Sequence, residues 1–321
     1  MKPNALKPLT LGRACHSEWP QPEYILGPLQ PGDVGLLSGA DGLGKSWVAL
    51  AAGLSVATGR SIAGGLWDVP EGVCGPVIYF AVEDREADHG RRIQAVIKHC
   101  RLHDELDAIE EDDDRLTLLP MLGQRVPLVQ PAEHGYQVTT QGAWWEEFIQ
   151  DYRLVILDPL RAFHDLVESD GAGMDFLVRW LVSVAMRNQQ AILLVHHASQ
   201  GAILDGREDH HAGRGATDLP AGCRGVWTLR GASEIKDESG ERWRVLVNGK
   251  ASHGAEADKR YARRGAGGVL YRAEPPSDPE DDSPTGGKAA RPTRRRAPAR
   301  SRLPAETSQV AATKGGSDDW Q

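Results

Sequence analysis

The chain has 321 residues, 40% of them hydrophobic, and a formal net charge of −8. This length fits one large α/β domain or two small ones. No apolar run approaches the ~20 residues that span a bilayer, and the N-terminus lacks a signal-peptide layout, so we expect a cytoplasmic protein with no membrane partner. The scattered cysteines Cys15, Cys74, Cys100 and Cys223 argue against a disulfide framework or a zinc ribbon. The negative charge argues only weakly against nucleic acid, because basic loops can line a local channel.

The N-terminal segment, residues 1–30, contains several prolines together with Trp19, Tyr24 and Ile25. We interpret it as an extended arm. Such an arm packs either on its own domain or on a neighbouring copy of the chain, and we favour the first.

A glycine-rich motif separates a strand predicted at 34–37 from a helix predicted at 47–57. It fits the P-loop pattern G-x-x-x-x-G-K-[ST] at every fixed position. Backbone N–H groups of such a loop and the following helix N-terminus attract a polyphosphate. The predicted nucleotide-binding residues are Gly39, Ala40, Asp41, Gly42, Leu43, Gly44, Lys45, Ser46 and Trp47.

Two of these residues carry defined chemistry. Lys45 is expected to reach the β- and γ-phosphates, and the hydroxyl of Ser46 is expected to bind Mg²⁺. The sequence therefore predicts a protein that binds a nucleoside triphosphate, with ATP and Mg²⁺ as cofactors.

Apolar strands and helices alternate along the next part of the chain. A glycine-rich link at 59–75 is followed by strands predicted at 76–82, near 116–119, at 153–158 and at 191–195, and by helices predicted at 85–100, 144–151 and 174–188. This alternation predicts a mostly parallel sheet covered by helices on both faces. Shorter strands at 226–229, 243–247 and 268–271 are expected to extend it as an antiparallel flank.

Polar residues stand at the carboxyl ends of four predicted strands: Gly39, Glu83, Asp158 and the pair His196–His197. In such sheets ligands bind beyond these ends. The sequence therefore predicts one active site to which four strands contribute.

Asp158 ends an apolar strand in the Walker-B arrangement, so we predict that it holds Mg²⁺ together with Ser46. Because Pro159 follows, no glutamate at that position can orient an attacking water. Glu83 is the candidate catalytic base. Its alternative interpretation is a charge at a helix N-terminus that the helix dipole favours.

The histidine pair has two interpretations. One is a zinc site formed by four histidines, His196, His197, His210 and His211. Adjacent residues at a strand end point in opposite directions, however, so both members of a pair cannot easily bind the same ion. We favour a γ-phosphate sensor that acts on the long loop 198–213. Arg214 and Arg224 follow this loop, each either a solvent-facing arginine or one supplied in trans to a neighbouring site.

Together these motifs resemble the RepA-type hexameric replicative helicases of IncQ-like plasmids, within the RecA-like P-loop ATPase superfamily. The resemblance spans about residues 22 to 274 and rests on segments 42–46, 76–84, 155–164, 196–201, 214–217 and 247–254. It implies a RecA-like α/β core with a mostly parallel sheet and an antiparallel C-terminal extension.

The resemblance also implies a homohexamer with ATP sites between subunits and single-stranded DNA in a central channel. It assigns phosphate and Mg²⁺ binding to Lys45, Ser46 and Asp158, the base to Glu83, and γ-phosphate sensing to His197 or His196. It places Arg92 near the nucleotide and Lys250 toward the neighbouring site. Arg224 or Arg214 would be the arginine finger.

We therefore expect an ATP hydrolase with residues 31–274 as its domain: a hexameric DNA helicase of the plasmid or phage replication type. A separate primase or initiator protein would be a partner, and loops 161–173 and 198–213 would contact DNA. The alternatives are a recombination or repair ATPase that forms filaments and a nucleotide-switched DNA-binding regulator. Residues 275–321 are predicted to be a disordered tail whose basic run, 288–302, either contacts DNA or only aids solubility.

Overall fold

The computed structural model describes residues 8–101, 113–197, 218–233, 235, 242–251 and 258–276. The chain divides into the units Met1–Pro276 and Ser277–Gln321, and every described residue belongs to the first. The predicted tail from residue 277 on, the loop 198–213 with its two histidines, and Arg214 lie outside the described residues. Within the described part, no helix has the length and apolar character needed to cross a membrane.

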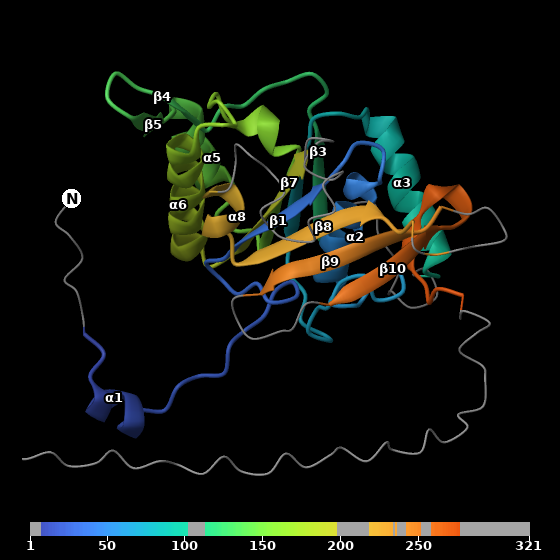
Figure 1. Cartoon of the computed structure of the whole chain (residues 1–321), viewed down its shortest axis with the longest axis horizontal. Coiled ribbons are helices and arrows are strands. Elements are labelled where there is room, and N and C mark those ends of the chain that lie inside the picture. The colour runs from blue at the N-terminus through green and yellow to red at the C-terminus, as the bar shows by residue number, and fades with distance from the viewer. Residues whose placement is uncertain are drawn as a thin grey trace, which may run out of the picture. The chain divides into compact units, whose positions relative to one another are not determined.

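Nine strands of the described residues form one sheet in the order β11-β10-β9-β8-β1-β7-β6-β2-β3 (Figure 1). Its parallel part runs from β8 to β3. The strands of this part are β1 (Val34–Gly39), β2 (Val77–Ala81), β3 (Leu116–Pro120), β6 (Leu154–Asp158), β7 (Ala191–His197) and β8 (Gly225–Gly231). The central strands β1, β2, β6 and β7 read as nearly continuous apolar runs because a sheet covered on both faces buries most of their side chains.

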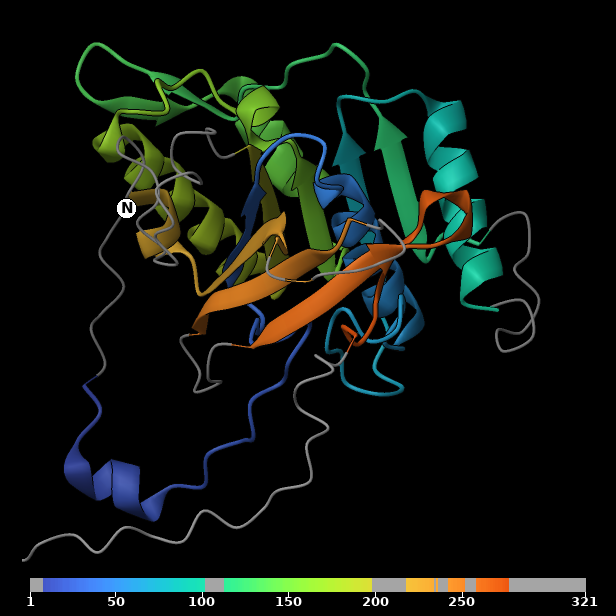
Figure 2. The ribbon, with the colours of Figure 1, turned by 45° about the vertical axis from the view of Figure 1, so that its right-hand side comes forward.

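The C-terminal strands extend the sheet beyond β8 (Figure 2). They are β9 (Arg244–Ala251), β10 (Lys259–Arg264) and β11 (Leu270–Arg272), and each pairs antiparallel with its neighbour. The predicted fold class, a mostly parallel α/β sheet with an antiparallel C-terminal extension, is confirmed.

Two apolar cores lie on opposite faces of the sheet. Helices α2 (Lys45–Thr58) and α3 (Glu86–His99) share one core with Tyr79, Ile156 and Leu193. Helices α5 (Thr140–Phe148), α6 (Gly171–Asn188) and α8 (Asp218–Gly222) cover the other face, where α5 and α6 pack on Ile78 and Val155. Successive residues of a strand face opposite sides of the sheet. Whether a residue has an odd or an even position in its strand (its parity) therefore decides which set of helices its side chain packs against.

The N-terminal segment departs from the expected extended arm, because α1 (Leu11–His16) is a short helix. Thr10 caps it by accepting a hydrogen bond from the Arg13 N–H, and none of its residues is buried. Further along, Ile25, Leu26 and Leu29 are buried in the core that contains α2. This end of the segment therefore packs on its own domain.

Several boundaries were predicted wrongly for local reasons. Helix α5 begins at Thr140 rather than 144, because the Thr139 hydroxyl accepts a hydrogen bond from the Gly142 N–H at 2.9 Å. Helix α6 begins at Gly171 rather than 174, because Asp170 caps it. The hairpin β4 (Val129–Pro131) and β5 (Tyr136–Val138), the strand β10 and the 3-10 turns η1 (Leu160–Phe163) and η2 (Ala266–Gly268) were not predicted.

Substitution of two helix glycines by alanine tests how tightly the helices pack, because one glycine is enclosed and the other is not. A Cβ at Gly142 would lie 2.4 Å from the Leu128 carbonyl oxygen, whereas a Cβ at Gly90 in α3 meets no atom within 4 Å. Gly142→Ala should lower the free energy of unfolding by about 1–3 kcal/mol through overpacking. Gly90→Ala should raise it by about 0.5–1 kcal/mol, because alanine favours the helix. Urea unfolding of both variants checks this, and a shift of the same sign in both contradicts it.

Candidate nucleotide-binding site

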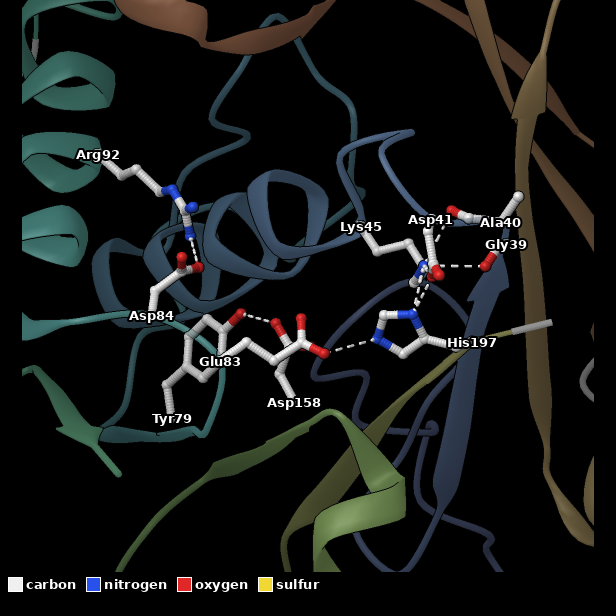
Figure 3. Close-up of polar contacts among 10 residues, drawn as sticks. All are labelled: Gly39, Ala40, Asp41, Lys45, Tyr79, Glu83, Asp84, Arg92, Asp158 and His197. Atoms are coloured by element: carbon white, nitrogen blue, oxygen red, sulfur yellow. Dashed lines mark hydrogen bonds and ion pairs between the residues drawn. The ribbon is translucent and has the colours of Figure 1, made fainter. Parts of the chain in front are cut away.

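The carboxyl ends of four strands meet beside the N-terminus of α2. In the register, Gly39 of β1 pairs with His197 of β7, and Ala81 of β2 pairs with Asp158 of β6. The close-up in Figure 3 shows His197 between Lys45 and Glu83, and Asp158 beside Glu83 in contact with Tyr79. The structure thus brings together the four strand ends that the sequence analysis assigned to one site.

The P-loop backbone surrounds the Lys45 ammonium group. Its Nζ donates to the carbonyl oxygens of Gly39 and Ala40 at 2.9 and 3.0 Å. Gly42 and Gly44 have φ values of 76° and 104°, in the left-handed region that favours glycine. The loop therefore needs these two glycines in order to turn from β1 into α2.

His197 links the P-loop to the end of β2. Its Nδ1 contacts the Asp41 carboxylate and lies 3.3 Å from Lys45 Nζ, and its Nε2 lies 3.3 Å from Glu83 Oε1. The Glu83 carboxylate, aided by Asp41, raises the pKa of His197. In return, the contact with His197 lowers the pKa of Glu83 and of Asp41. His197 thus stands between two carboxylates, in contact with Asp41 through Nδ1 and with Glu83 through Nε2.

The two histidines of the pair face opposite sides of the sheet, as expected. Val195 and Leu193, which share the parity of His197, lie in the core with α2, whereas Leu194, with the parity of His196, lies in the other. Burial lowers the pKa of His196. Of the two candidates, the structure brings His197 to the P-loop.

Asp158 is 5% exposed and accepts a hydrogen bond from the Tyr79 hydroxyl. Burial raises the pKa of Asp158, while hydrogen bonds from Tyr79 and Ser46 act in the opposite direction. Burial, followed by the Asp158 charge, raises the pKa of Tyr79 well above its usual value. The Ser46 hydroxyl and the Asp158 carboxylate are adjacent oxygen donors of the kind that Mg²⁺ prefers, so these residues fit the ion.

Tyr79 was missed by the sequence analysis, which treated it as one more apolar residue of a strand. Its position offered a signal, since it lies two residues before the end of β2 and has the parity that faces α2. A tyrosine hydroxyl in a buried strand usually finds a hydrogen-bond partner.

Arg92 and Trp47 lie on the α3 side of the loop. Arg92 Nη1 donates to Asp84 Oδ2 at 2.6 Å, and its guanidinium group stands 5.8 Å from the centre of the Trp47 ring. From the antiparallel flank, Arg244 Nε donates to the Leu43 carbonyl at 2.8 Å, a contact that the sequence did not indicate. Helix α3 and strand β9 therefore bound the P-loop from two sides.

Comparison with known proteins places this site in a family. A family model described as an AAA domain matches residues 2–202. The chain belongs to this AAA domain family. Membership supports an ATPase and implies nucleotide binding, for which the P-loop residues above are the candidates.

Two solved structures resemble the fold of this AAA domain. One is an ATPase domain, which matches with a TM-score of 0.50 and 13% identity, over 77% of this chain and 86% of that one. The other is a DnaB-like replicative helicase, solved to show its interactions with primase, which matches with a TM-score of 0.54 and 12% identity. That match covers 76% of this chain and 60% of the helicase. At such identities the likeness shows the fold alone, a mostly parallel α/β sheet with helices on its faces.

Arg224 and Lys250 of the AAA domain lie at the opposite edge of the sheet. The Arg224 N–H donates to the carbonyl of Val34, the first residue of β1, at 2.8 Å. Five residues of strand, roughly 16 Å at 3.3 Å each, separate that point from Gly39. Lys250 Nζ donates to the Ala221 carbonyl at 2.8 Å on the same edge. Neither side chain meets the P-loop of its own chain.

Of the four histidines considered for a zinc set, His210 and His211 lie outside the described residues. Among the residues that the structure describes, no group of three or more His, Cys, Asp or Glu side chains is arranged to hold a metal ion.

The His197 contacts predict a pH-dependent stability. A raised pKa in the folded state means that the stabilisation is fully present below pH ~6.5, the unperturbed value, and is lost as the pH rises through the raised pKa. The melting temperature of the wild type should therefore exceed that of His197→Gln most at about pH 6, and the difference should shrink by about pH 9. His16→Gln in the exposed α1 is the control, and a difference that stays constant with pH contradicts the prediction.

Proposed function

We propose that this protein is an ATP-hydrolysing DNA helicase that works as a homohexamer on single-stranded DNA. The observation that carries the proposal is the meeting of Lys45, Glu83, Asp158 and His197 at one sheet edge. A phosphate-binding lysine, a buried metal-binding acid, a separate carboxylate and a polar side chain that contacts both the lysine and that carboxylate are the parts of a phosphoryl-transfer site.

Each residue has a distinct task in the proposed hydrolysis. Lys45 and the N-terminus of α2 bind the phosphates, while Ser46 and Asp158 hold Mg²⁺, which when bound offsets phosphate charge. Glu83 orients the attacking water and accepts its proton. Its lowered pKa keeps the carboxylate ionised, and a side chain that is 52% exposed leaves it accessible to water. His197 touches both Glu83 and Lys45 and so can respond to the γ-phosphate.

Two arginines at the segment after β6, one from that segment and one from the connection between β3 and β4, support the DNA-binding part of the proposal. Arg125 and Arg161 both donate to the His164 carbonyl, at 2.9 and 3.2 Å, and their side chains are 51% and 52% exposed. His164 is fully buried and anchors this segment, since its Nδ1 accepts the Leu166 N–H at 3.2 Å. Burial, with Arg161 next, lowers the pKa of His164 to about 4. These two half-exposed guanidinium groups also contact Asp165 and Glu168, and we propose that phosphates of a DNA strand compete for them.

The proposed partners follow from the same comparison and the sequence. The DnaB-like helicase was solved with its interactions with primase, which supports a separate primase or initiator protein as a partner here. Arg224 and Lys250 would complete the ATP site of a neighbouring subunit, with Arg92 beside the nucleotide. Closed rings in electron micrographs would favour the helicase, whereas open filaments on DNA would favour the recombination ATPase.

The ATPase test compares the unaltered protein with Lys45→Ala and Glu83→Gln, with and without single-stranded DNA. Lys45→Ala should lose both ATP binding and hydrolysis, because the phosphates lose their cation. Glu83→Gln should still bind ATP but hydrolyse it about 10²–10⁴-fold more slowly, the usual worth of a general base. Glu147→Gln on the exposed side of α5 is the control. Unchanged hydrolysis in Glu83→Gln contradicts the proposed base, and absence of stimulation by DNA contradicts the motor.

A subunit-mixing experiment tests Arg224. Arg224→Ala alone should retain ATP binding and lose roughly 10³-fold or more in turnover, the usual effect of a missing arginine finger. Equal mixtures with Lys45→Ala should regain activity, because about a quarter of the interfaces in a randomly mixed ring pair an intact Lys45 with an intact Arg224. Arg179→Ala, whose side chain is 79% exposed on α6, is the control. If the mixture stays inactive, Arg224 does not act across the interface.

A further inference from the structure

A pocket of about 220 Å³ opens beside the antiparallel flank of the sheet. Strands β8, β9 and β10 form part of it, and two segments, around Tyr24 and Trp67, form the rest. None of the candidate nucleotide-binding residues lines it, so the pocket is separate from the site described above. Its volume is below the ~300–1,000 Å³ of sites for drug-sized ligands, which favours a single small ring system.

Two tryptophan rings pack against each other at the base of the pocket and present only a small part of their surface to it. Trp67 and Trp227 pack edge to face with centroids 4.9 Å apart, and both are almost fully buried. The Trp67 indole N–H donates to the Val48 carbonyl at 2.8 Å, which fixes that ring. A Cβ at Gly225 or Gly35 would lie within 3.0 Å of the Trp227 ring, so these glycines leave room for it. The Trp67 and Trp227 rings are therefore fixed in position without a ligand.

One polar atom of the pocket lacks a partner. Asn248, which lies opposite Trp227 in the β8–β9 register, is 9% exposed, and its Oδ1 is buried without a hydrogen-bond donor in the structure. The nearby cation does not serve it, because Arg260 donates to Asp68, Asp258 and the carbonyls of Gly65 and Leu66. Most buried carbonyl oxygens are hydrogen-bonded, so an unpaired one in a pocket indicates a missing donor.

We propose that this pocket binds a planar heteroaromatic ring of about the size of indole, whose ring N–H donates to Asn248 Oδ1. The exposed parts of the two tryptophan rings at the base favour a flat ring that meets them edge to face. The lining carboxylates, Asp68 and Asp258, outnumber the single guanidinium of Arg260, so an anionic ligand such as a nucleotide is disfavoured. The proposal shares no residue with the ATPase site and stands independently of it.

The test measures binding of 5-fluoroindole to the full chain by ¹⁹F line broadening, with indole and indene as competitors. Indene has the same shape without the N–H, so indole should displace the probe at a roughly tenfold lower concentration, as expected for one hydrogen bond to a buried acceptor. Asn248→Leu keeps the branched side-chain shape, removes the acceptor, and should make the two competitors equal. Asn188→Leu, which does not line the pocket, should leave the preference for indole unchanged.

A second competition experiment, with a peptide, distinguishes two possible sources of such a ring: a free small molecule and a tryptophan side chain. Trp19 is 51% exposed, so a peptide of residues 12–22 is the natural probe. Displacement by the peptide at lower concentrations than indole assigns the ring to a polypeptide, and displacement by indole alone assigns it to a small molecule. Absence of probe binding, or equal competition by indole and indene in the unaltered protein, overturns the proposal even if Asn248→Leu fails to fold.

Discussion

A buried ammonium group holds the carboxyl edge of this sheet together. The Lys45 side chain is 5% exposed, and a charge withdrawn from water is costly unless it is paired. Burial lowers the pKa of Lys45, whereas the carboxylates of Asp41, Asp158 and Glu83 act to raise it. These carboxylates follow β1, end β6 and follow β2, respectively. Charge balance at one nitrogen therefore ties together strand ends that are distant in the sequence.

The exposure of these three carboxylates differs. It indicates which one a bound triphosphate would displace from Lys45 and which ones would stay in place. Asp41 is 79% exposed and approaches Lys45 to 3.6 Å, so it can turn to solvent when a phosphate takes over the ammonium group. Asp158 is 5% exposed and held by Tyr79, so it would stay in place to meet the proposed Mg²⁺. Glu83, half exposed and in contact with His197, has the freedom to meet a water. In the proposed hydrolysis, these differences in burial would give three identical functional groups three different tasks.

Much of this edge could be predicted from the sequence, because a parallel sheet places every strand's carboxyl end on the same side. Gly39, Glu83, Asp158 and the histidine pair followed from that rule alone. The choice of His197 over His196 needed the register. The Tyr79–Asp158 contact joins residues that no local pattern links. Strand β10 was missed because its residues, Lys259–Arg264, are mostly charged and its pairing with β9 depends on backbone hydrogen bonds. The short helix α1 buries none of its residues, so its sequence lacks the regular spacing of apolar residues that predicts a helix.

The sheet also explains why one chain is insufficient for the proposed reaction. In a parallel sheet the amino and carboxyl edges are separated by the full strand length, and Arg224 sits at the amino edge beside Asp33. No side-chain rotation carries a guanidinium group across β1 to the P-loop, because five strand residues exceed the reach of an arginine. A ring in which the amino edge of one subunit faces the carboxyl edge of the next removes this separation. Head-to-tail contacts of that kind form a closed ring when the rotations between successive subunits add up to a full turn. The geometry that excludes Arg224 from its own site is therefore the geometry that a hexameric ring would use.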